Sequence, residues 1–420
     1  MPPALLIKDV RIFDGEKEIP SGSVLVEDGV IRQVSEGSLP APNESTIVIS
    51  KPGHTLIPGI IDGHIHAHID EKNTELKQSL SFGVTTVCDM HQEAENIGKL
   101  REFAQDPDAA DFKTSSQAAT VLGGWPAAVI TAHDKSEETM ATIATWPNIK
   151  TKADVEKYIQ ERVADKVDYI KLLHEDGNGL SVKPTLMPLE LQKSLVEAAH
   201  KHGFLAVAHA LSLQATLDIL RVGVDGMTHT FCDEAPTKEV IDAYLVNNAH
   251  CNPTLVAIGS LTTEGQKEQE KYAHDPRVQK LIGDEARQRL CACMAMNNGK
   301  SKVENAYQSV RELKAAGIDI ILGSDSAGAA LGTGFGVSAH HELASLVSKC
   351  GFTPEEALRS GTSLVAKRLR LHDRGRIAGG LRADLVLVEG NPLEDIDNTL
   401  NLRGVWKQGT LCSVYNSILA

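Results

Sequence analysis

The sequence predicts an α/β fold: a (β/α)8 barrel of the TIM type with a small β-sandwich domain that both termini form together. Two observations lead to this prediction. Eight β-like segments alternate with helical segments through the middle of the chain, as in the βα units of a closed parallel barrel. Both ends instead read as short strands separated by tight turns. An open, doubly wound sheet is the alternative, but no GxGxxG motif follows the first strand of the middle region.

The strands at the two ends are expected to pair with one another. They occupy residues 5–15, 23–35, 383–392 and 403–415. Asp28-Gly29 and Gln408-Gly409 mark the turns of two hairpins. Neither end has enough strands to form a stable sheet alone, so the economical solution is one composite β domain.

The expected domain boundaries follow from this pairing. Residues 1–57 and 373–420 would form the composite β-sandwich domain, and residues 58–372 would form the barrel as a single insertion between its halves.

The predicted barrel strands and helices alternate in order. The strands are expected at 56–68, 83–90, 113–124, 167–177, 203–210, 226–231, 250–257 and 318–326. Helical patterns include 151–165, 188–203 and 213–223. Gly203 stands where a helix C-terminal glycine belongs, and Thr353-Pro354-Glu355-Glu356 has the pattern of a capping box. The segment 258–300 is polar and predicted helical, and its position would let it cover the barrel mouth.

Composition and charge narrow the class of protein. The formal net charge of −14 argues against nucleic-acid and anionic-membrane partners and favours solubility, but it says nothing about the substrate. The expected partner is a small-molecule substrate. The N-terminal sequence has no signal-peptide pattern, and no segment has the apolar length of a membrane span. Seven scattered cysteines without a CxxC pair suit reduced thiols, so we expect a cytoplasmic protein. Large barrels often associate, which makes a homo-oligomer possible.

Titratable side chains fall at the predicted C-terminal ends of the strands, where barrel enzymes hold their catalytic groups. They are His64, His66, Lys171, His209, His229 and Asp325. The first two lie two apart on one strand and therefore project to the same side. Imidazoles together with a carboxylate are ligands typical of Zn²⁺ and related ions.

Each of these residues also has a structural interpretation. A lone HxH is more often incidental, a single buried histidine more often just completes a hydrogen bond, and Asp325 could cap the following helix. A lysine on a strand, such as Lys171, normally lies at an edge or in a salt bridge. The metal interpretation is favoured because all of these residues lie at the ends of different strands of one predicted barrel.

At these motifs the chain resembles the amidohydrolase superfamily. The motifs are GIIDGHIHAH, the YIK lysine, VAHA, THT and GSDS, and the C-terminal run GRIAGGLRADLVLVEGNPL is similar to the branch that contains imidazolonepropionase, the prolidase-like amidohydrolases and the ochratoxin-hydrolysing amidases. Members of this branch are (β/α)8 barrels with a β-sandwich built from both termini. The resemblance covers nearly the whole chain.

The resemblance implies a role for each residue of the site. His64, His66 and Asp325 would hold the more buried ion, and His209 and His229 the second. Lys171 would carry a carbamate on its ε-nitrogen and bridge the two ions. An unmodified ammonium would be repelled by two dications, whereas a carbamate offers an anionic oxygen to each. Two divalent ions of the Zn²⁺ type are therefore expected.

The implied reaction is hydrolysis of an amide-type C–N bond. A hydroxide activated by the metal ions would attack the carbonyl, and Asp325 would accept a proton and return it to the leaving amine. An N-acyl or aryl amide, a dipeptide and a cyclic amide are all compatible with this centre.

Four residues are candidates for contact with the substrate, namely His68, Trp125, Tyr169 and His174. The chain departs from the family pattern on this side. It has Gly123-Gly124-Trp125 where the prolidase-like branch commonly has Gly-Gly-His, and threonines flank His229. Transfer of a substrate from the relatives is correspondingly weak.

Three other functions remain compatible with a barrel. A mononuclear deaminase, decarboxylase or lyase would need one ion and an unmodified Lys171. An imine-forming enzyme would use Lys171 as its nucleophile and leave the histidines without a purpose. A non-catalytic scaffold would be expected to have lost metal ligands, and none is missing from the sequence.

Overall fold

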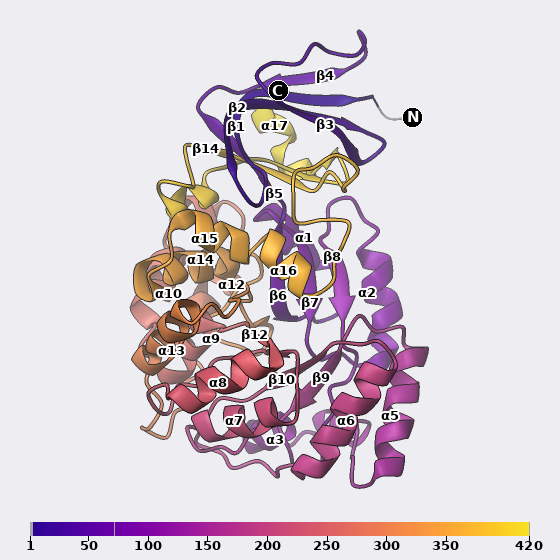
Figure 1. The fold of residues 1–420 in the computed structure, drawn as a ribbon, viewed down its shortest axis with the longest axis vertical. Helices are drawn as coiled ribbons and strands as arrows, with labels where there is room; N and C mark the ends of the chain where they lie inside the picture. Colours follow the sequence, from indigo (N-terminus) through magenta and orange to yellow (C-terminus); the bar gives the residue numbers. More distant parts are fainter. Residues whose placement is uncertain (1–2, 71, 420) are drawn as a thin grey trace.

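A computed structural model describes residues 3–70 and 72–419, and it joins the two ends of the chain in one eight-stranded sheet at the top of Figure 1. The strands are β1 (Leu5–Phe13), β2 (Glu18–Glu27), β3 (Val30–Glu36), β4 (Ile47–Ser50), β5 (His54–Pro58), β14 (Leu385–Glu389), β15 (Leu402–Lys407) and β16 (Thr410–Leu411). They follow the order β16-β15-β14-β5-β1-β2-β3, and β4 pairs with β1. β14 runs antiparallel to β5, so the C-terminal strands extend the N-terminal sheet. The second layer that a sandwich requires stays a prediction.

Both predicted hairpin turns are present. Asp28 and Gly29 have φ values of 52° and 76° between β2 and β3, and Gln408 and Gly409 have φ values of 48° and 73° between β15 and β16. Two consecutive positive φ values match the twist of a two-residue hairpin, and this is why glycine is favoured at these turns.

The middle of the chain forms two four-stranded parallel sheets. Their strands are β6 (Ile60–His66), β7 (Val84–Asp89), β8 (Asp111–Thr114), β9 (Ile170–Leu173), β10 (Ala206–His209), β11 (Gly226–Met227), β12 (His250–Cys251) and β13 (Ser326–Ala327). One sheet has the order β13-β6-β7-β8 and the other β12-β11-β10-β9. Single parallel pairings, Ala119 with Leu172 and Cys251 with Ile320, connect the two sheets.

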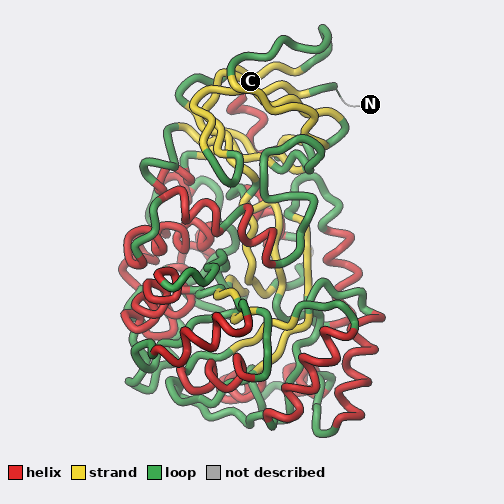
Figure 2. Tube along the Cα trace, viewed as in Figure 1, coloured by secondary structure: helices red, strands yellow, loops and turns green. Residues whose placement is uncertain are grey.

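Helices surround these parallel strands, as the red and yellow segments of Figure 2 show. The longer ones are α1 (Thr74–Ser81), α5 (Lys152–Ala164), α6 (Leu189–Lys201), α7 (Leu213–Arg221), α8 (Lys238–Asn247), α9 (Leu255–Thr262), α10 (Gln266–Ala273), α13 (Val303–Ala315) and α14 (Val337–Cys350). Shorter ones are α2 (Ile97–Phe103), α3 (Ala127–His133), α4 (Glu137–Ala144), α11 (Pro276–Gln279), α12 (Asp284–Leu290), α15 (Pro354–Ser360), α16 (Ser363–Arg368) and α17 (Asn416–Leu419).

The amphipathic pattern explains why the helices lie where they do. In α7 the buried Leu213, Leu217 and Leu220 recur at helical spacing and face the core. Helices α5, α6 and α7 confirm the three helical predictions, and α10 to α12 confirm that 258–300 is largely helical. No helix within residues 3–70 and 72–419 combines the length and apolar character that a membrane crossing requires.

Several predicted strands differ from the observed ones. Of residues 113–124 only 113 and 114 lie in a strand, β8, and of residues 226–231 only 226 and 227 do, in β11. Residues 255–257 were expected to extend the strand at 250, but they begin helix α9. The physical reason is a distant contact, because the Glu342 carboxylate accepts the first N–H groups of that helix. Within the predicted strand 318–326 only Ser326 is assigned to a strand, β13, which continues to Ala327.

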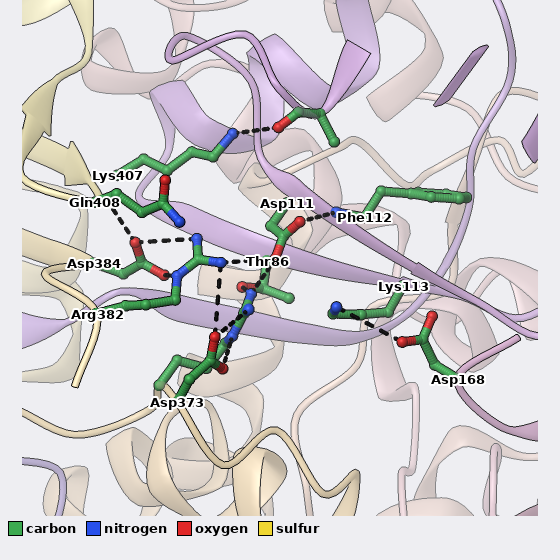
Figure 3. A network of polar contacts seen from close by, with 12 residues as sticks. Thr86, Asp111, Phe112, Lys113, Asp168, Asp373, Arg382, Asp384, Lys407 and Gln408 are labelled. Atoms are coloured by element: carbon green, nitrogen blue, oxygen red, sulfur yellow. Dashed lines mark hydrogen bonds and ion pairs between the residues drawn. The ribbon is translucent and has the colours of Figure 1, made fainter. Parts of the chain in front are cut away.

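A network of charges joins the terminal sheet to the parallel strands (Figure 3). Asp111 at the start of β8 receives hydrogen bonds from Arg374 and, over 3.1 Å, from Arg382. Arg374 also donates to the Thr86 hydroxyl of β7 over 2.9 Å. Lys407 of β15 donates to three backbone carbonyls just after α2, at 2.6 to 3.0 Å. Side chains from the C-terminal part of the chain thereby hold the terminal sheet against the parallel strands.

Candidate functional site

Three of the predicted ligands meet at the C-terminal end of β6. His64 and His66 close this strand, and Asp325 precedes β13, its neighbour in the sheet. The Asp325 Oδ1 lies 3.2 Å from the Nε2 atoms of both histidines, and these two nitrogens lie 3.3 Å apart. His64 is fully buried, whereas the His66 side chain is 34% exposed. The group of three therefore has a closed side at His64 and a side at His66 that is open to solvent.

The arrangement of these three atoms fits a divalent ion. Four ligands placed tetrahedrally at about 2.1 Å from Zn²⁺ lie about 3.4 Å from one another. The separations of 3.2 to 3.3 Å match that spacing. Two imidazole nitrogens aimed at one carboxylate oxygen are also the donor types that Zn²⁺ prefers.

Asp62 is a buried carboxylate that holds together the two backbone segments carrying His64 and Asp325. It accepts the backbone N–H groups of His64 over 3.2 Å and of Ser324 over 2.9 Å, and the Ser324 hydroxyl over 2.6 Å. The backbone N–H of Asp325 in turn donates to the His64 carbonyl over 2.8 Å. Asp325 has φ 54°, a left-handed conformation that is uncommon for a residue with a side chain. Backbone strain of this kind is concentrated at functional sites.

The pKa shifts of His64 and Asp325 favour the protonation states that can bind a cation. Burial lowers the pKa of His64 to about 3, so its imidazole is neutral. Burial acts to raise the pKa of Asp325, but the neighbouring His64 and the hydrogen bonds from His64 and His66 hold that pKa well below its ordinary value. A neutral imidazole and an ionised carboxylate are the protonation states that bind metal.

The second predicted pair, His209 and His229, lies beside the first group. The ring centroids of His209 and His229 are 4.6 Å apart, and those of His229 and His64 are 4.9 Å apart. Burial holds the pKa of both His209 and His229 well below the ordinary value. The four imidazoles thus form one continuous cluster.

In both His209 and His229, one ring nitrogen contacts a neighbouring side chain that lies outside the cluster of imidazoles. The His209 Nε2 lies 3.1 Å from the carboxylate of Glu175, and the His229 Nδ1 lies 2.6 Å from the hydroxyl of Thr254. A proton on each of these nitrogens leaves the other nitrogen of the ring free to bind an ion. Glu175 is itself fixed, because it accepts the N–H groups of Gly177 and Leu211.

Lys171 lies on β9 and is buried. Burial lowers its pKa to about 7, and the carboxylates of Asp325 and Asp89 act in the opposite direction. Its ammonium nitrogen donates to the Thr228 hydroxyl, next to His229. A buried amine that is substantially neutral at physiological pH can react with CO₂, so this residue fits the predicted carbamate.

The four predicted substrate contacts occupy different environments. Trp125 stacks on the His209 ring at 4.8 Å with an interplanar angle of 21°. His68 is exposed just beyond β6. His174 is buried at the end of β9, where burial lowers its pKa, and its Nδ1 has no hydrogen-bond partner among the described residues. Tyr169 packs in the interior and donates to the Asp89 carbonyl over 2.8 Å, which favours a packing role over contact with substrate.

Sequence reasoning assigned no role to the partners of the metal-site histidines. The sequence does not predict a role for Glu175, Thr254 or Glu342. The signal for Glu175 is its position directly after β9, one residue beyond His174. Thr254 and Glu342 have no such local signal, because Thr254 reaches His229, and Glu342 reaches the start of α9, only through the tertiary fold.

Comparison with known proteins places the chain in a family. It matches the amidohydrolase family over residues 55–412. Over 71 residues it is 42% identical to imidazolonepropionase of Deinococcus deserti, a match that covers 16% of this chain and only 18% of the relative.

Solved structures with low sequence identity share the fold. A Xaa-Pro dipeptidase has a TM-score of 0.74 at 20% identity, covering 97% of this chain and 99% of that one. Molinate hydrolase has a TM-score of 0.74 at 18% identity, covering 98% and 94%. The ochratoxinase of A. niger has a TM-score of 0.72 at 17% identity, covering 97% and 96%. Because the family match extends over most of the sequence, the chain belongs to the amidohydrolase family, a family of hydrolases.

Proposed function

We propose that this protein is a metal-dependent hydrolase that cleaves an amide-type C–N bond of a small molecule. The observation that carries the proposal is the convergence of His64, His66 and Asp325 within 3.3 Å of one another. Family membership supports hydrolysis, and the Xaa-Pro dipeptidase among the structural neighbours supports a C–N bond as the target.

The proposed architecture is the one that the family implies. The two parallel sheets would close into a (β/α)8 barrel over residues 58–372. Hydrogen bonds at both junctions support closure, with Ala119 N–H donating to the Lys171 carbonyl over 2.8 Å and Ile321 N–H to the Cys251 carbonyl over 2.9 Å. Residues 1–57 and 373–420 would form the β-sandwich domain.

The proposed centre holds two divalent ions of the Zn²⁺ type. His64, His66 and Asp325 would bind one ion, His209 and His229 the other, and a carbamate on Lys171 both. The neutral Lys171 amine would attack the carbon of CO₂: the N–C bond forms as one C–O π bond breaks, its electron pair goes to that oxygen, and the proton lost from nitrogen passes to water. When bound, the ions supply a hydroxide nucleophile at neutral pH and polarise the substrate carbonyl.

The protein's own side chains would then move the proton. Asp325 is ionised and lies beside His64 and His66, so it would accept a proton and return it to the leaving amine nitrogen. Trp125 covers one face of His209 and would form one wall of the substrate site, with His68 and His174 at the mouth. The closed side at His64 would keep bulk water away from the reacting carbonyl.

Metal analysis combined with a substrate panel tests this proposal. We expect about two Zn²⁺-type ions per chain, and activity on some of the N-acyl amino acids, Xaa-Pro dipeptides or aryl amides that is lost on chelation and restored by metal. His64→Asn and Asp325→Asn should lose both ions and activity, whereas Lys193→Gln on the outer face of α6 should retain them. Less than about one ion per chain, with no activity restored by added metal, would contradict the proposal.

A mononuclear deaminase, decarboxylase or lyase is the second candidate function. Two observations favour it: His64, His66 and Asp325 form a ligand group that is complete by itself, and the Lys171 amine is bonded to Thr228. Lys171→Ala discriminates between the two candidates. For the binuclear hydrolase we expect activity to fall at least about 100-fold and short carboxylic acids to restore part of it. A variant with one ion per chain and no response to carboxylic acids would favour the mononuclear enzyme.

A further inference from the structure

The N-terminus of helix α9 is capped in an unusual way. Thr254 is its N-cap residue, and a threonine at this position normally accepts a hydrogen bond from the second or third N–H of the helix. Within residues 3–70 and 72–419 the Thr254 side chain makes no such bond. Its hydroxyl instead lies 2.6 Å from the His229 Nδ1. Thr254 also has φ 50°, which a β-branched residue rarely adopts, so the surrounding structure must hold it there.

Glu342 of helix α14 caps α9 in place of Thr254. One carboxylate oxygen accepts the N–H of Leu255 over 2.8 Å, and the other accepts the N–H of Val256 over 2.9 Å. Glu342 is fully buried, and its two oxygens accept N–H groups that a helix N-terminus leaves without an intrahelical acceptor. Burial raises its pKa to about 8, and the two N–H groups act in the opposite direction.

Helix α14 is itself fixed on either side of Glu342. The His340 ring bonds to the Phe82 carbonyl over 2.7 Å and to the Thr399 hydroxyl over 2.9 Å. The adjacent His341 stacks on Tyr272 at 4.6 Å. Through His340, His341 and Glu342, helix α14 thus contacts Phe82, Thr399, Tyr272 and the start of α9. These contacts hold the Glu342 carboxylate in place. Because Glu342 accepts the first N–H groups of α9, it also holds the start of that helix in place.

We propose that Glu342 is a positioning residue for the second metal ion, because it takes over the capping of α9 and so frees the Thr254 hydroxyl to orient His229. The inference rests on the proposed binuclear centre. Without Glu342, the N–H groups of α9 lack an acceptor, and the Thr254 hydroxyl turns back to cap its own helix. His229 then loses the contact that fixes its ring and its tautomer. Partners of this kind typically change metal affinity 10- to 100-fold.

Zn²⁺ titration of the metal-free full-length protein, with a chelator to buffer the free ion, tests the inference. Glu342→Gln should weaken binding of the ion at His209 and His229 at least about 10-fold and leave the ion at His64, His66 and Asp325 within about 3-fold. Thr254→Val should likewise weaken binding of the ion at His209 and His229 alone, whereas Thr254→Ser, which keeps the hydroxyl, should not. The double variant Glu342→Gln/Thr254→Val should be no worse than the single ones, because both remove the same contact.

A matched control separates positioning from general destabilisation. Glu356→Gln removes a glutamate that caps helix α15 through the Thr353 N–H, a helix without a contact to the metal-site histidines. It should leave the affinity for both ions unchanged. Equal weakening of both ions in Glu342→Gln, or no weakening, overturns the inference while the proposed function stands. Wild-type protein that binds no second ion overturns the inference together with the binuclear centre. If Glu342→Gln does not fold, unchanged binding in Thr254→Val overturns it.

Discussion

At the scale of single residues, the chemistry of the site depends on which nitrogen of each imidazole is free. His64 and His66 present their Nε2 atoms to Asp325. His209 uses its Nε2 for Glu175, so its Nδ1 would bind an ion, whereas His229 uses its Nδ1 for Thr254. The outer partner therefore fixes the tautomer of each ring in the second pair, and a ring with the wrong tautomer cannot bind.

Glu175→Gln tests this dependence directly. The amide keeps the size of the side chain, but it replaces one carboxyl oxygen with an NH₂ group and so weakens the contact that fixes the His209 Nε2. We expect the catalytic rate to fall about 10- to 100-fold, together with weaker binding of the second ion. Metal content and steady-state kinetics measure the two effects. The control Glu197→Gln changes an exposed glutamate of α6 and should alter neither. Unchanged kinetics in Glu175→Gln would mean that the contact does not orient His209.

At the scale of secondary-structure elements, some helix ends can be predicted from the local sequence and others cannot. The capping box at Thr353 and Glu356 is visible in the sequence and is present in the structure, where Thr353 caps α15 and Glu356 returns the bond. The start of α9 is not visible in this way. Its acceptor, Glu342, lies more than 80 residues away, so the segment HCNPTLVA reads as a strand.

Thr353→Ala measures the contribution of the local cap. The hydroxyl that accepts the Glu356 N–H is lost, and we expect the free energy of unfolding to fall by about 1 kcal/mol. Urea titration followed by circular dichroism measures this change. Thr353→Ser retains the hydroxyl and should restore most of the stability. An alanine variant as stable as the wild type would show that the cap contributes nothing here.

At the scale of the whole molecule, buried charges hold the terminal sheet against the parallel strands. Asp111 accepts hydrogen bonds from Arg374 and Arg382, both of which come from the C-terminal part of the chain. Figure 3 labels Asp111 and Arg382. Burial acts to raise the pKa of Asp111, but Arg374, Lys113 and Arg382 hold it below its ordinary value of 3.8. The junction therefore depends on an ionised carboxylate.

Asp111→Asn should lower the free energy of unfolding by about 3 kcal/mol at neutral pH, because it leaves the arginines without their shared partner. A lowered pKa in the folded state stabilises the protein above pH 3.8, and this contribution is lost as the pH falls through the lowered value. The difference between variant and wild type should therefore shrink in acid. Urea titrations between pH 7 and pH 2 measure it.

An exposed ion pair provides the control for this experiment. Asp242→Asn breaks the pair with Lys238 on the surface of α8 and should cost less than about 0.5 kcal/mol. A difference between Asp111→Asn and wild type that stays constant across this pH range would contradict the assigned role of Asp111.

The sequence by itself determined the alternation of strands and helices, the hairpin turns at both ends and the identity of the principal ligand candidates. These features depend on neighbours in the chain: periodicity, turn residues, and histidines or aspartates placed just where a strand ends. His64 and His66 share one face because they are two apart on β6.

Only the tertiary structure decided how these candidates are held. Asp62 meets Ser324, Glu175 meets His209, and Glu342 reaches the start of α9, each across a sequence distance that no local pattern spans. Burial also sets the protonation of His64 and Lys171, and burial is a property of the packed fold. The reason is physical, because hydrogen bonds and desolvation depend on proximity in space, which the chain acquires only on folding.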